Sequence, residues 1–281
     1  MIKEISIIGG GTMGNGIATV FALNNYSVNL VEMDQTRLEK AINSISNNLN
    51  RMVKKGTIHE KQLQESLNRI TSLIGVKNTP SSSDLVIEAI YENRGAKLLI
   101  FKELEDIIKT ECIFASNTSS ISITELATSC RPTKFIGMHF MNPVPVMKLI
   151  EIIRGFSTSD ETFKLIYDLS ISIDKTPVEV NDYPGFISNR ILLPMINEAI
   201  FALMEGVARA EDIDKVMKLG MNHPMGPLTL ADFIGLDVCL AIMEVLYHGY
   251  NDPKYRPCPL LKKMVAAGKF GKKSGEGFYK Y

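Results

Sequence analysis

Short apolar runs alternate with amphipathic segments along the chain as far as Val180. The runs read as strands and cover residues 5–8, 28–31, 84–89, 113–116, 135–139, 149–153 and 178–180. The amphipathic segments read as helices and cover residues 12–23, 36–55, 94–109 and 160–173. Strands that alternate with helices predict an α/β domain with a mostly parallel sheet covered on both faces.

The interval between the second and third runs is too long for a single connecting helix. Residues 36–55 carry an apolar stripe at helical spacing, and Gly56 is a plausible stop signal. Thr57 and Glu60 then have the spacing of a capping box, which predicts a second helix that ends near Asn68. We therefore expect a helical hairpin inserted before the sheet resumes.

The pattern changes after Asp182, where no strong strand follows. Asp182 and Pro184 are typical of a helix start, and the segment 186–204 is apolar on most of its circumference. Such a helix is buried in a core or against another subunit. Further helices are predicted over residues 210–219, 227–246 and 259–267. We expect two domains, an α/β domain over residues 1–183 and an all-helical domain over residues 184–281.

Three glycines follow the first apolar run directly and open the first helix. Gly9, Gly11 and Gly14 form a G-x-G-x-x-G pattern, the fingerprint of a Rossmann-type dinucleotide fold. Gly9 permits a tight turn, and Gly11 lets a pyrophosphate approach bare backbone. Gly14 lets the helix pack closely against the strand.

The residues around this loop favour NAD among the nucleotides that such a fold binds. Backbone N–H groups at Thr12 and Met13 lie at the positive end of a helix, where phosphates are stabilised. Glu32 ends the second strand, where a carboxylate accepts hydrogen bonds from a ribose and repels the 2′-phosphate of NADP. The motif alone leaves FAD and S-adenosylmethionine open as ligands.

Composition narrows the choice of partners and compartment. Lys+Arg and Asp+Glu are both 31, so the formal charge is zero and neither nucleic acid nor an anionic membrane is expected as a bulk partner. The four cysteines form no C-x-x-C, and there is neither a signal-like segment nor an apolar run of about 18 residues. We expect a soluble, reduced, cytoplasmic protein without a metal site.

One histidine stands out because it ends a predicted strand. His139 opens a proline-containing loop, and Glu151 lies in the strand that follows this loop. If the two strands are neighbours, the carboxylate reaches the imidazole and supports general acid–base chemistry. The alternative is a structural histidine with a solvent-facing glutamate.

Three other polar features each have a structural and a functional interpretation. The hydroxyl-rich segment around Ser119 either caps a helix or directs a hydroxyl at a cofactor or substrate. Asn189 lies in an otherwise apolar helix and needs a polar partner, for which a substrate oxygen is one candidate. Arg51, Lys54 and Lys55 share one helix face, which is either solvated or binds the phosphates of an anionic substrate.

Taken together, these motifs resemble the L-3-hydroxyacyl-CoA dehydrogenase family over essentially the whole chain. The resemblance rests on residues 8–17, 88–93, 116–120, 137–148, 184–190, 222–227 and 270–279. It implies NAD-dependent interconversion of an L-(S)-3-hydroxyacyl-CoA and a 3-ketoacyl-CoA, and we expect the four-carbon pair. The family is typically dimeric through its helical domain, which implies a homodimer here.

The resemblance also implies individual roles. His139 is similar to the family's catalytic base and Glu151 to its partner, while Ser119 and Asn189 match groups that orient the reacting oxygen. The implied NAD contacts are Glu92, Lys97, Ser119, Asn142 and Lys273. The implied coenzyme A contacts are Asn48, Arg51, Lys54 and Lys55, with Asn48 in place of a serine that is usual in the family.

Two rival functions remain open. One is a dehydrogenase of a free hydroxyacid, although enzymes of that type often use a lysine base where this chain has Asn189. The other is a non-catalytic NAD-binding relative with a structural or regulatory role. The intact set of Ser119, His139, Glu151 and Asn189 argues against it.

Overall fold

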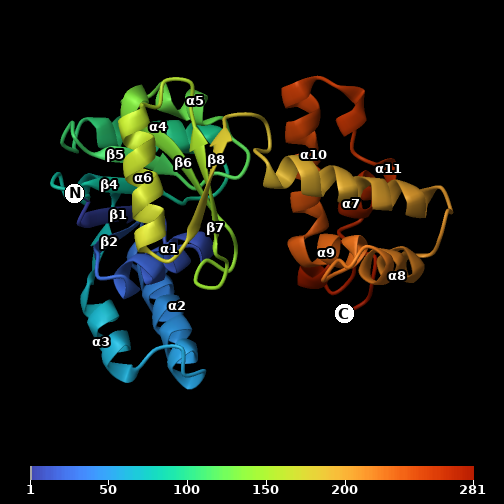
Figure 1. Ribbon diagram of the computed structural model, residues 1–281, viewed down its shortest axis with the longest axis horizontal. Helices are drawn as coiled ribbons and strands as arrows, with labels where there is room; N and C mark the ends of the chain where they lie inside the picture. The colour runs from blue at the N-terminus through green and yellow to red at the C-terminus, as the bar shows by residue number, and fades with distance from the viewer. Residues whose placement is uncertain (1) are drawn as a thin grey trace. The chain divides into compact units, whose positions relative to one another are not determined.

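A computed structural model describes residues 2–281 of the chain (Figure 1). The chain divides into two compact units, the first ending at Asp182 and the second spanning Tyr183–Tyr281. Each unit has a hydrophobic core of its own.

The first unit is built on an eight-stranded sheet in the order β3-β2-β1-β4-β5-β6-β7-β8. The strands are β1 (Glu4–Ile8), β2 (Ser27–Glu32), β3 (Ile70–Ile74), β4 (Leu85–Glu88), β5 (Ile113–Ser116), β6 (Phe135–Phe140), β7 (Leu149–Arg154) and β8 (Thr176–Asn181). All neighbouring pairs are parallel except β6 and β7, which are antiparallel. The expected mostly parallel sheet is therefore confirmed.

Helices pack against this sheet and complete the unit. They are α1 (Thr12–Leu23), α2 (Gln35–Lys54), α3 (Glu60–Asn68), α4 (Arg94–Glu105), α5 (Ile123–Ala127) and α6 (Asp160–Ser172), with short 3₁₀ turns at Val76–Asn78 and Pro132–Lys134. Ile17 and Phe21 of α1 and Ile166 of α6 are buried in one core with strand residues such as Ile7. The expected helical insertion is formed by α2 and α3, which project from one end of the sheet (Figure 1).

Strand direction decides where function can lie. Because β1, β2, β4, β5 and β6 run parallel, their carboxyl ends meet at one edge of the sheet. This is the edge at which open α/β sheets bind ligands. The antiparallel β7 returns from the same edge, so that Glu151 is the register partner of His139.

The helical insertion differs from expectation at two points. Residues 70–74 form β3, an edge strand that pairs with β2 and that the hydrophobic pattern did not predict. Thr71 and Ser72 are exposed there, so the strand lacks a buried face. The predicted cap at Thr57 is also wrong, since α3 begins at Glu60 and the Gln62 side chain accepts the His59 N–H at 3.0 Å.

The second unit is helical. It contains α7 (Ser188–Met204), α8 (Ala210–Gly220), α9 (Pro227–Ile234), α10 (Leu236–Tyr250) and α11 (Pro259–Ala266), with 3₁₀ turns at Pro253–Tyr255 and Lys272–Ser274. Leu193, Ile196 and Ile200 of α7 form its core with residues of the other helices. The single helix predicted over residues 227–246 is wrong, because the chain breaks at Gly235 with a φ of +105°.

Asp182 caps a different helix from the one expected. Its carboxylate accepts the Ser122 hydroxyl at 2.7 Å and the N–H groups of Ile123 and Thr124 at 3.1 and 2.7 Å. These groups belong to the N-terminus of α5, whose first N–H groups have no acceptor within the helix. Asp182 therefore ties the end of the first unit to its own sheet domain, and α7 begins only at Ser188.

Candidate active site

The three motif glycines have three different surroundings. Gly9 has a φ of +97°, which side chains rarely adopt. A Cβ on Gly14 would lie 1.8 Å from the Gly9 carbonyl oxygen, so only glycine allows α1 to approach the loop this closely. A Cβ on Gly11 would meet no atom within 4 Å. Gly9 and Gly14 therefore shape the loop, while Gly11 leaves its backbone open to a ligand.

This loop borders a cavity of about 610 Å³ at the carboxyl edge of β1 and β2. Its lining includes Gly11, Thr12 and Glu32 from the predicted site, whereas Met13 is not among the lining residues. The Glu32 carboxylate accepts the Gly10 N–H at 2.7 Å and the Met33 N–H at 3.1 Å. The loop and the acidic residue are thus joined, and the carboxylate has a fixed place in the cavity.

The residues present fit an NAD cofactor. The cavity lies within the range of about 300–1,000 Å³ typical of ligand sites. It combines open backbone at Gly11, the N-terminus of the long helix α1 and a fixed carboxylate at Glu32. One cavity therefore combines groups suited to a phosphate with an acceptor suited to a ribose.

A smaller cavity of about 270 Å³ shares Thr12, Asn15 and Ser44 with the first. It brings together Asn48 from α2 and Asn142 from the loop after β6. The Asn48 amide donates to the Asn15 side-chain oxygen at 3.4 Å. A predicted coenzyme A contact and a predicted NAD contact therefore lie in one small polar pocket.

The basic residues predicted to bind coenzyme A lie elsewhere on the insertion. Arg51, Lys54 and Lys55 are exposed at the C-terminal end of α2, and none of them lines either cavity. Their cationic face is therefore available to a ligand at the surface.

The imidazole of His139 is held by a carboxylate. Its Nδ1 lies 2.7 Å from Oε2 of Glu151, and the two side chains lie at facing register positions of β6 and β7. His139 is 8% exposed and Glu151 is 2% exposed. With Nδ1–H donated to the carboxylate, Nε2 is the ring nitrogen that can exchange a proton with a substrate.

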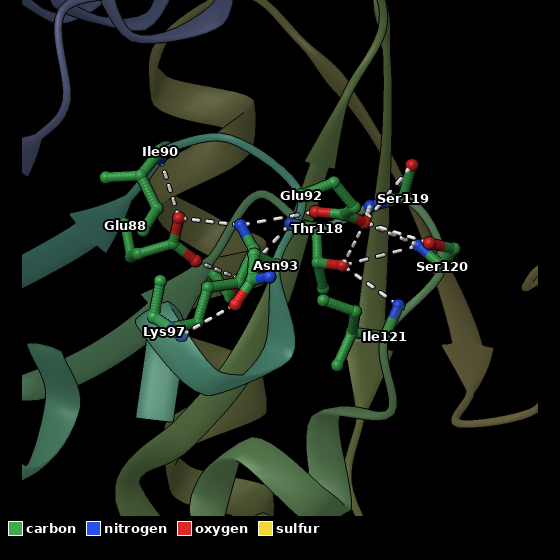
Figure 2. A network of polar contacts seen from close by, with 11 residues as sticks. Glu88, Ile90, Glu92, Asn93, Lys97, Thr118, Ser119, Ser120 and Ile121 are labelled. Atoms are coloured by element: carbon green, nitrogen blue, oxygen red, sulfur yellow. Dashed lines mark hydrogen bonds and ion pairs between the residues drawn. The ribbon is translucent and has the colours of Figure 1, made fainter. Parts of the chain in front are cut away.

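The turn that carries Ser119 wraps around the carboxylate of Glu92 (Figure 2). Oε1 of Glu92 accepts the Thr118 hydroxyl at 2.6 Å and the N–H groups of Ser119 and Ser120 at 3.0 and 3.1 Å. Asn117, at the start of this turn, accepts the Phe140 N–H at 3.0 Å. The Ser119 turn is therefore fixed beside the end of the strand that carries His139.

Behind this turn, one ammonium group joins two carboxylates. The Lys97 Nζ lies 2.7 Å from Oε1 of Glu88 and 3.2 Å from Oε2 of Glu92 (Figure 2). Burial raises the pKa of Glu88 above its ordinary value, against the opposing charge of Lys97. Burial also acts to raise the pKa of Glu92, but the Lys97 charge and the turn donors outweigh it and lower that pKa.

Two predicted residues belong to the second unit. Asn189 lies in the first turn of α7, and Lys273 lies in the 3₁₀ turn near the C-terminus. The Lys273 Nζ donates to Oδ2 of Asp237 at 2.7 Å. Of the predicted catalytic residues, His139, Glu151 and Ser119 lie in the first unit. Asn189 lies in the second.

The sequence interpretation missed several residues of the site. Arg37, Lys40, Tyr91 and Leu99 also line the larger cavity. Nothing local distinguishes them from ordinary surface or core positions. Glu88 did carry a signal, because it is a charged residue at the end of a fully buried strand.

The structure also bears on metals and membranes. Within residues 2–281 there is no group of three or more His, Cys, Asp or Glu side chains that could hold a metal ion. No helix in that range has the length and apolar character needed to cross a membrane.

The fold and site define a two-domain dehydrogenase, and family models specify it further. The model described as "3-hydroxyacyl-CoA dehydrogenase, NAD binding domain" matches residues 4–183, and that described as "3-hydroxyacyl-CoA dehydrogenase, C-terminal domain" matches residues 185–281. The chain belongs to the 3-hydroxyacyl-CoA dehydrogenase family.

Full-length relatives narrow the comparison. A probable 3-hydroxybutyryl-CoA dehydrogenase of Deinococcus radiodurans is 55% identical, with 99% of this chain and 100% of that protein covered. A 3-hydroxybutyryl-CoA dehydrogenase of Bradyrhizobium diazoefficiens is 51% identical over 100% of this chain and 96% of its own length. The crystal structure of (S)-3-hydroxybutyryl-CoA dehydrogenase from Ralstonia eutropha has a TM-score of 0.97 at 48% identity, covering 100% of this chain and 99% of that one.

Proposed function

We propose that this protein is an NAD-dependent dehydrogenase that interconverts L-(S)-3-hydroxybutyryl-CoA and acetoacetyl-CoA. The observation that carries the proposal is the His139–Glu151 pair, at 2.7 Å, on the sheet edge that also carries the dinucleotide loop. The identity to relatives named 3-hydroxybutyryl-CoA dehydrogenase supports the four-carbon substrate.

The chain's own groups handle the proton. In oxidation, Nε2 of His139 removes the proton of the 3-hydroxyl group, and in reduction the imidazolium returns it. Glu151 stabilises the imidazolium and fixes the ring, which supports general acid–base catalysis. We assign Ser119 and Asn189 the task of orienting the reacting oxygen. Bound NAD would supply the hydride acceptor for C3, and bound NADH the hydride donor.

Binding roles follow from the two cavities. We assign the phosphates of NAD to the backbone of Gly11, Thr12 and Met13, and the adenosine ribose to Glu32. Asn142 is proposed to contact NAD from the smaller pocket. The family resemblance also implies NAD contacts at Glu92, Lys97 and Lys273; of these we propose Glu92 and Lys273, because the Lys97 side chain is only 1% exposed.

The helical insertion supplies the groups that we assign to coenzyme A. We assign coenzyme A to Asn48 in the small pocket and to the exposed cations at the end of α2. The exposed positions of Arg51, Lys54 and Lys55 suit a nucleotide phosphate that stays in water.

A spectrophotometric assay tests the proposed function. Purified protein should oxidise NADH when acetoacetyl-CoA is added, and much more slowly with free acetoacetate or with NADPH. Comparable rates with free acetoacetate would favour the free-acid rival. Tight NADH binding without turnover on either substrate would favour the non-catalytic rival.

We further propose that the protein forms a homodimer through its helical unit. Val216 and Leu219 of α8 are 59% and 76% exposed, and Met221 just beyond the helix is 61% exposed. Apolar side chains gathered on one helix end suit burial against a second copy. Light scattering should give a dimer mass, and Leu219→Asp should shift it toward the monomer. A monomeric wild type would contradict this proposal.

We also propose a reducing, cytoplasmic compartment. Cys112, Cys130, Cys239 and Cys258 are all free thiols. Burial raises the pKa of the Cys112 thiol to about 12, so it is protonated and unreactive at neutral pH. Fractionation of the native cell should place the protein with the cytoplasmic enzymes, and recovery with secreted proteins would contradict the proposal.

A further inference from the structure

Two buried charged residues lie close to the proposed site but do not line its cavity. Glu88 is 0% exposed and Lys97 is 1% exposed. Their sequence neighbours Ala89 and Ala96 line the dinucleotide cavity, whereas Glu88 and Lys97 do not. A buried ion pair is costly to desolvate and is not by itself a source of stability. Its position calls for a role other than direct contact with cofactor or substrate.

The pair connects three segments of the sheet edge. Glu88 ends β4 and accepts the Ile90 N–H and the Ser116 hydroxyl, at 2.7 and 2.6 Å, in addition to Lys97. Ser116 ends β5 and accepts the Thr118 N–H at 3.2 Å. Glu88 therefore fixes the point at which the chain leaves β5 for the Ser119 turn.

The second contact of Lys97 acts on the same turn from the other side. Its ammonium holds Oε2 of Glu92, and this leaves Oε1 to accept the donors of the turn. The Lys97 Nζ lies 2.7 Å from Glu88 and 3.2 Å from Glu92, so the ammonium is shared between the two carboxylates. The three charged groups thus place Oε1 of Glu92 where it accepts hydrogen bonds from Thr118 and Ser119.

We propose that Glu88 and Lys97 are positioning residues that act through Glu92 and the Thr118–Ser120 turn to hold Ser119 in its reactive orientation. This inference rests on the proposed function, because it takes Ser119 to orient the reacting oxygen. It assigns Lys97 a different task from the NAD contact implied by the family resemblance. Its ammonium lies between two carboxylates and its side chain is buried.

Kinetics separate positioning from cofactor binding. Glu88→Gln and Lys97→Met should each lower kcat for acetoacetyl-CoA reduction about tenfold to hundredfold, the cost of a misplaced reacting group. The KM of acetoacetyl-CoA should stay within about twofold of wild type, and the Kd of NADH should rise by a smaller factor than kcat falls. A raised NADH Kd with kcat preserved in Lys97→Met would overturn the proposal in favour of a direct cofactor contact.

A double-mutant cycle with Ser119→Ala gives a readout that a purely structural role does not move. If the buried pair acts through Ser119, adding Lys97→Met to Ser119→Ala should lower kcat by less than about twofold. An undiminished further loss in that background would overturn the proposal. If Ser119→Ala alone leaves kcat unchanged, the role of Ser119 in the proposed function is wrong, and the inference fails with it.

Two further variants provide a control for the loss of an ion pair and a test of the turn itself. Lys109→Met removes an ion pair of similar geometry, with 2.7 Å between Lys109 Nζ and Asp84 Oδ1, at the opposite edge of the sheet, and should leave kcat unchanged. Thr118→Val removes a turn hydroxyl that binds Glu92 but leaves the buried pair intact. If neither substitution of the pair yields folded protein, a normal kcat in Thr118→Val overturns the proposal, and a reduced kcat that is not additive with Ser119→Ala supports it.

Discussion

Alanine substitutions at Gly11 and Gly14 should give opposite phenotypes although the two glycines belong to one motif. A Cβ on Gly11 meets nothing within 4 Å, and the φ of −61° at this residue suits alanine. Gly11→Ala should therefore change the free energy of unfolding by no more than about 1 kcal/mol. The added methyl group projects into the cavity and keeps a phosphate from the backbone N–H groups. One lost charge-assisted hydrogen bond of about 1.5–3 kcal/mol raises the Kd of NADH about tenfold to hundredfold.

Gly14→Ala should instead destabilise the fold. Its Cβ would lie 1.8 Å from the carbonyl oxygen of Gly9 and 2.9 Å from the carbonyl carbon, and these backbone atoms cannot rotate away. Overpacked cores lose about 1–3 kcal/mol, and a backbone clash belongs at the upper end of that range or beyond it. We expect a loss of about 3 kcal/mol or more.

Two measurements distinguish the variants. The chain has no tryptophan, so urea unfolding is best followed by far-ultraviolet circular dichroism, and NADH binding by calorimetry. A Gly11→Ala variant that binds NADH like wild type, or a Gly14→Ala variant of unchanged stability, would refute the assignment of separate tasks to these glycines.

Three further outcomes follow from the contacts of single carboxylates. Glu32→Ala should raise the preference for NADPH over NADH about tenfold in steady-state assays, because the charge that repels a 2′-phosphate is removed; an unchanged ratio contradicts this. Asp182→Ala should lower the free energy of unfolding in urea by about 1–2 kcal/mol, since the first N–H groups of α5 lose their acceptor although Ser122 remains as the N-cap; unchanged stability would contradict this role of Asp182. The pKa of Glu92 is lowered on folding, so its stabilising effect is fully present above its ordinary value of 4.5 and is lost as the pH falls below 4.5 through the folded pKa. The difference in free energy of unfolding between wild type and Glu92→Gln should therefore narrow from about pH 7 to about pH 4. A difference that widens over this range would mean that folding raises the pKa of Glu92 instead of lowering it.

The parts of the fold that the sequence predicts well are those with a buried pattern. Strands such as β4 and β5 are buried along their whole length, and their apolar runs are visible locally. The edge strand β3 has exposed Thr71 and Ser72, so it lacks that signal. The break at Gly235 depends on a backbone conformation that a continuous helical pattern conceals.

The site shows the same division between local and tertiary information. The glycine loop and Glu32 are read from the sequence because their spacing is local. The contact between His139 and Glu151 depends on the pairing and register of β6 and β7. The sequence alone does not determine whether these two strands are neighbours. The burial of Lys97 between Glu88 and Glu92 unites residues of two elements, and no local pattern indicates it. Asp182 likewise resembles a local cap but binds α5, whose position only the folded sheet defines.

The most direct test of the account is the kcat of His139→Ala for acetoacetyl-CoA reduction, with the Kd of NADH measured on the same preparation. If the imidazole held by Glu151 carries the proton, kcat falls by about 10²–10⁴ while NADH binds as in wild type. A kcat that stays within about threefold of wild type would mean that another group moves the proton, and the proposed mechanism would be wrong.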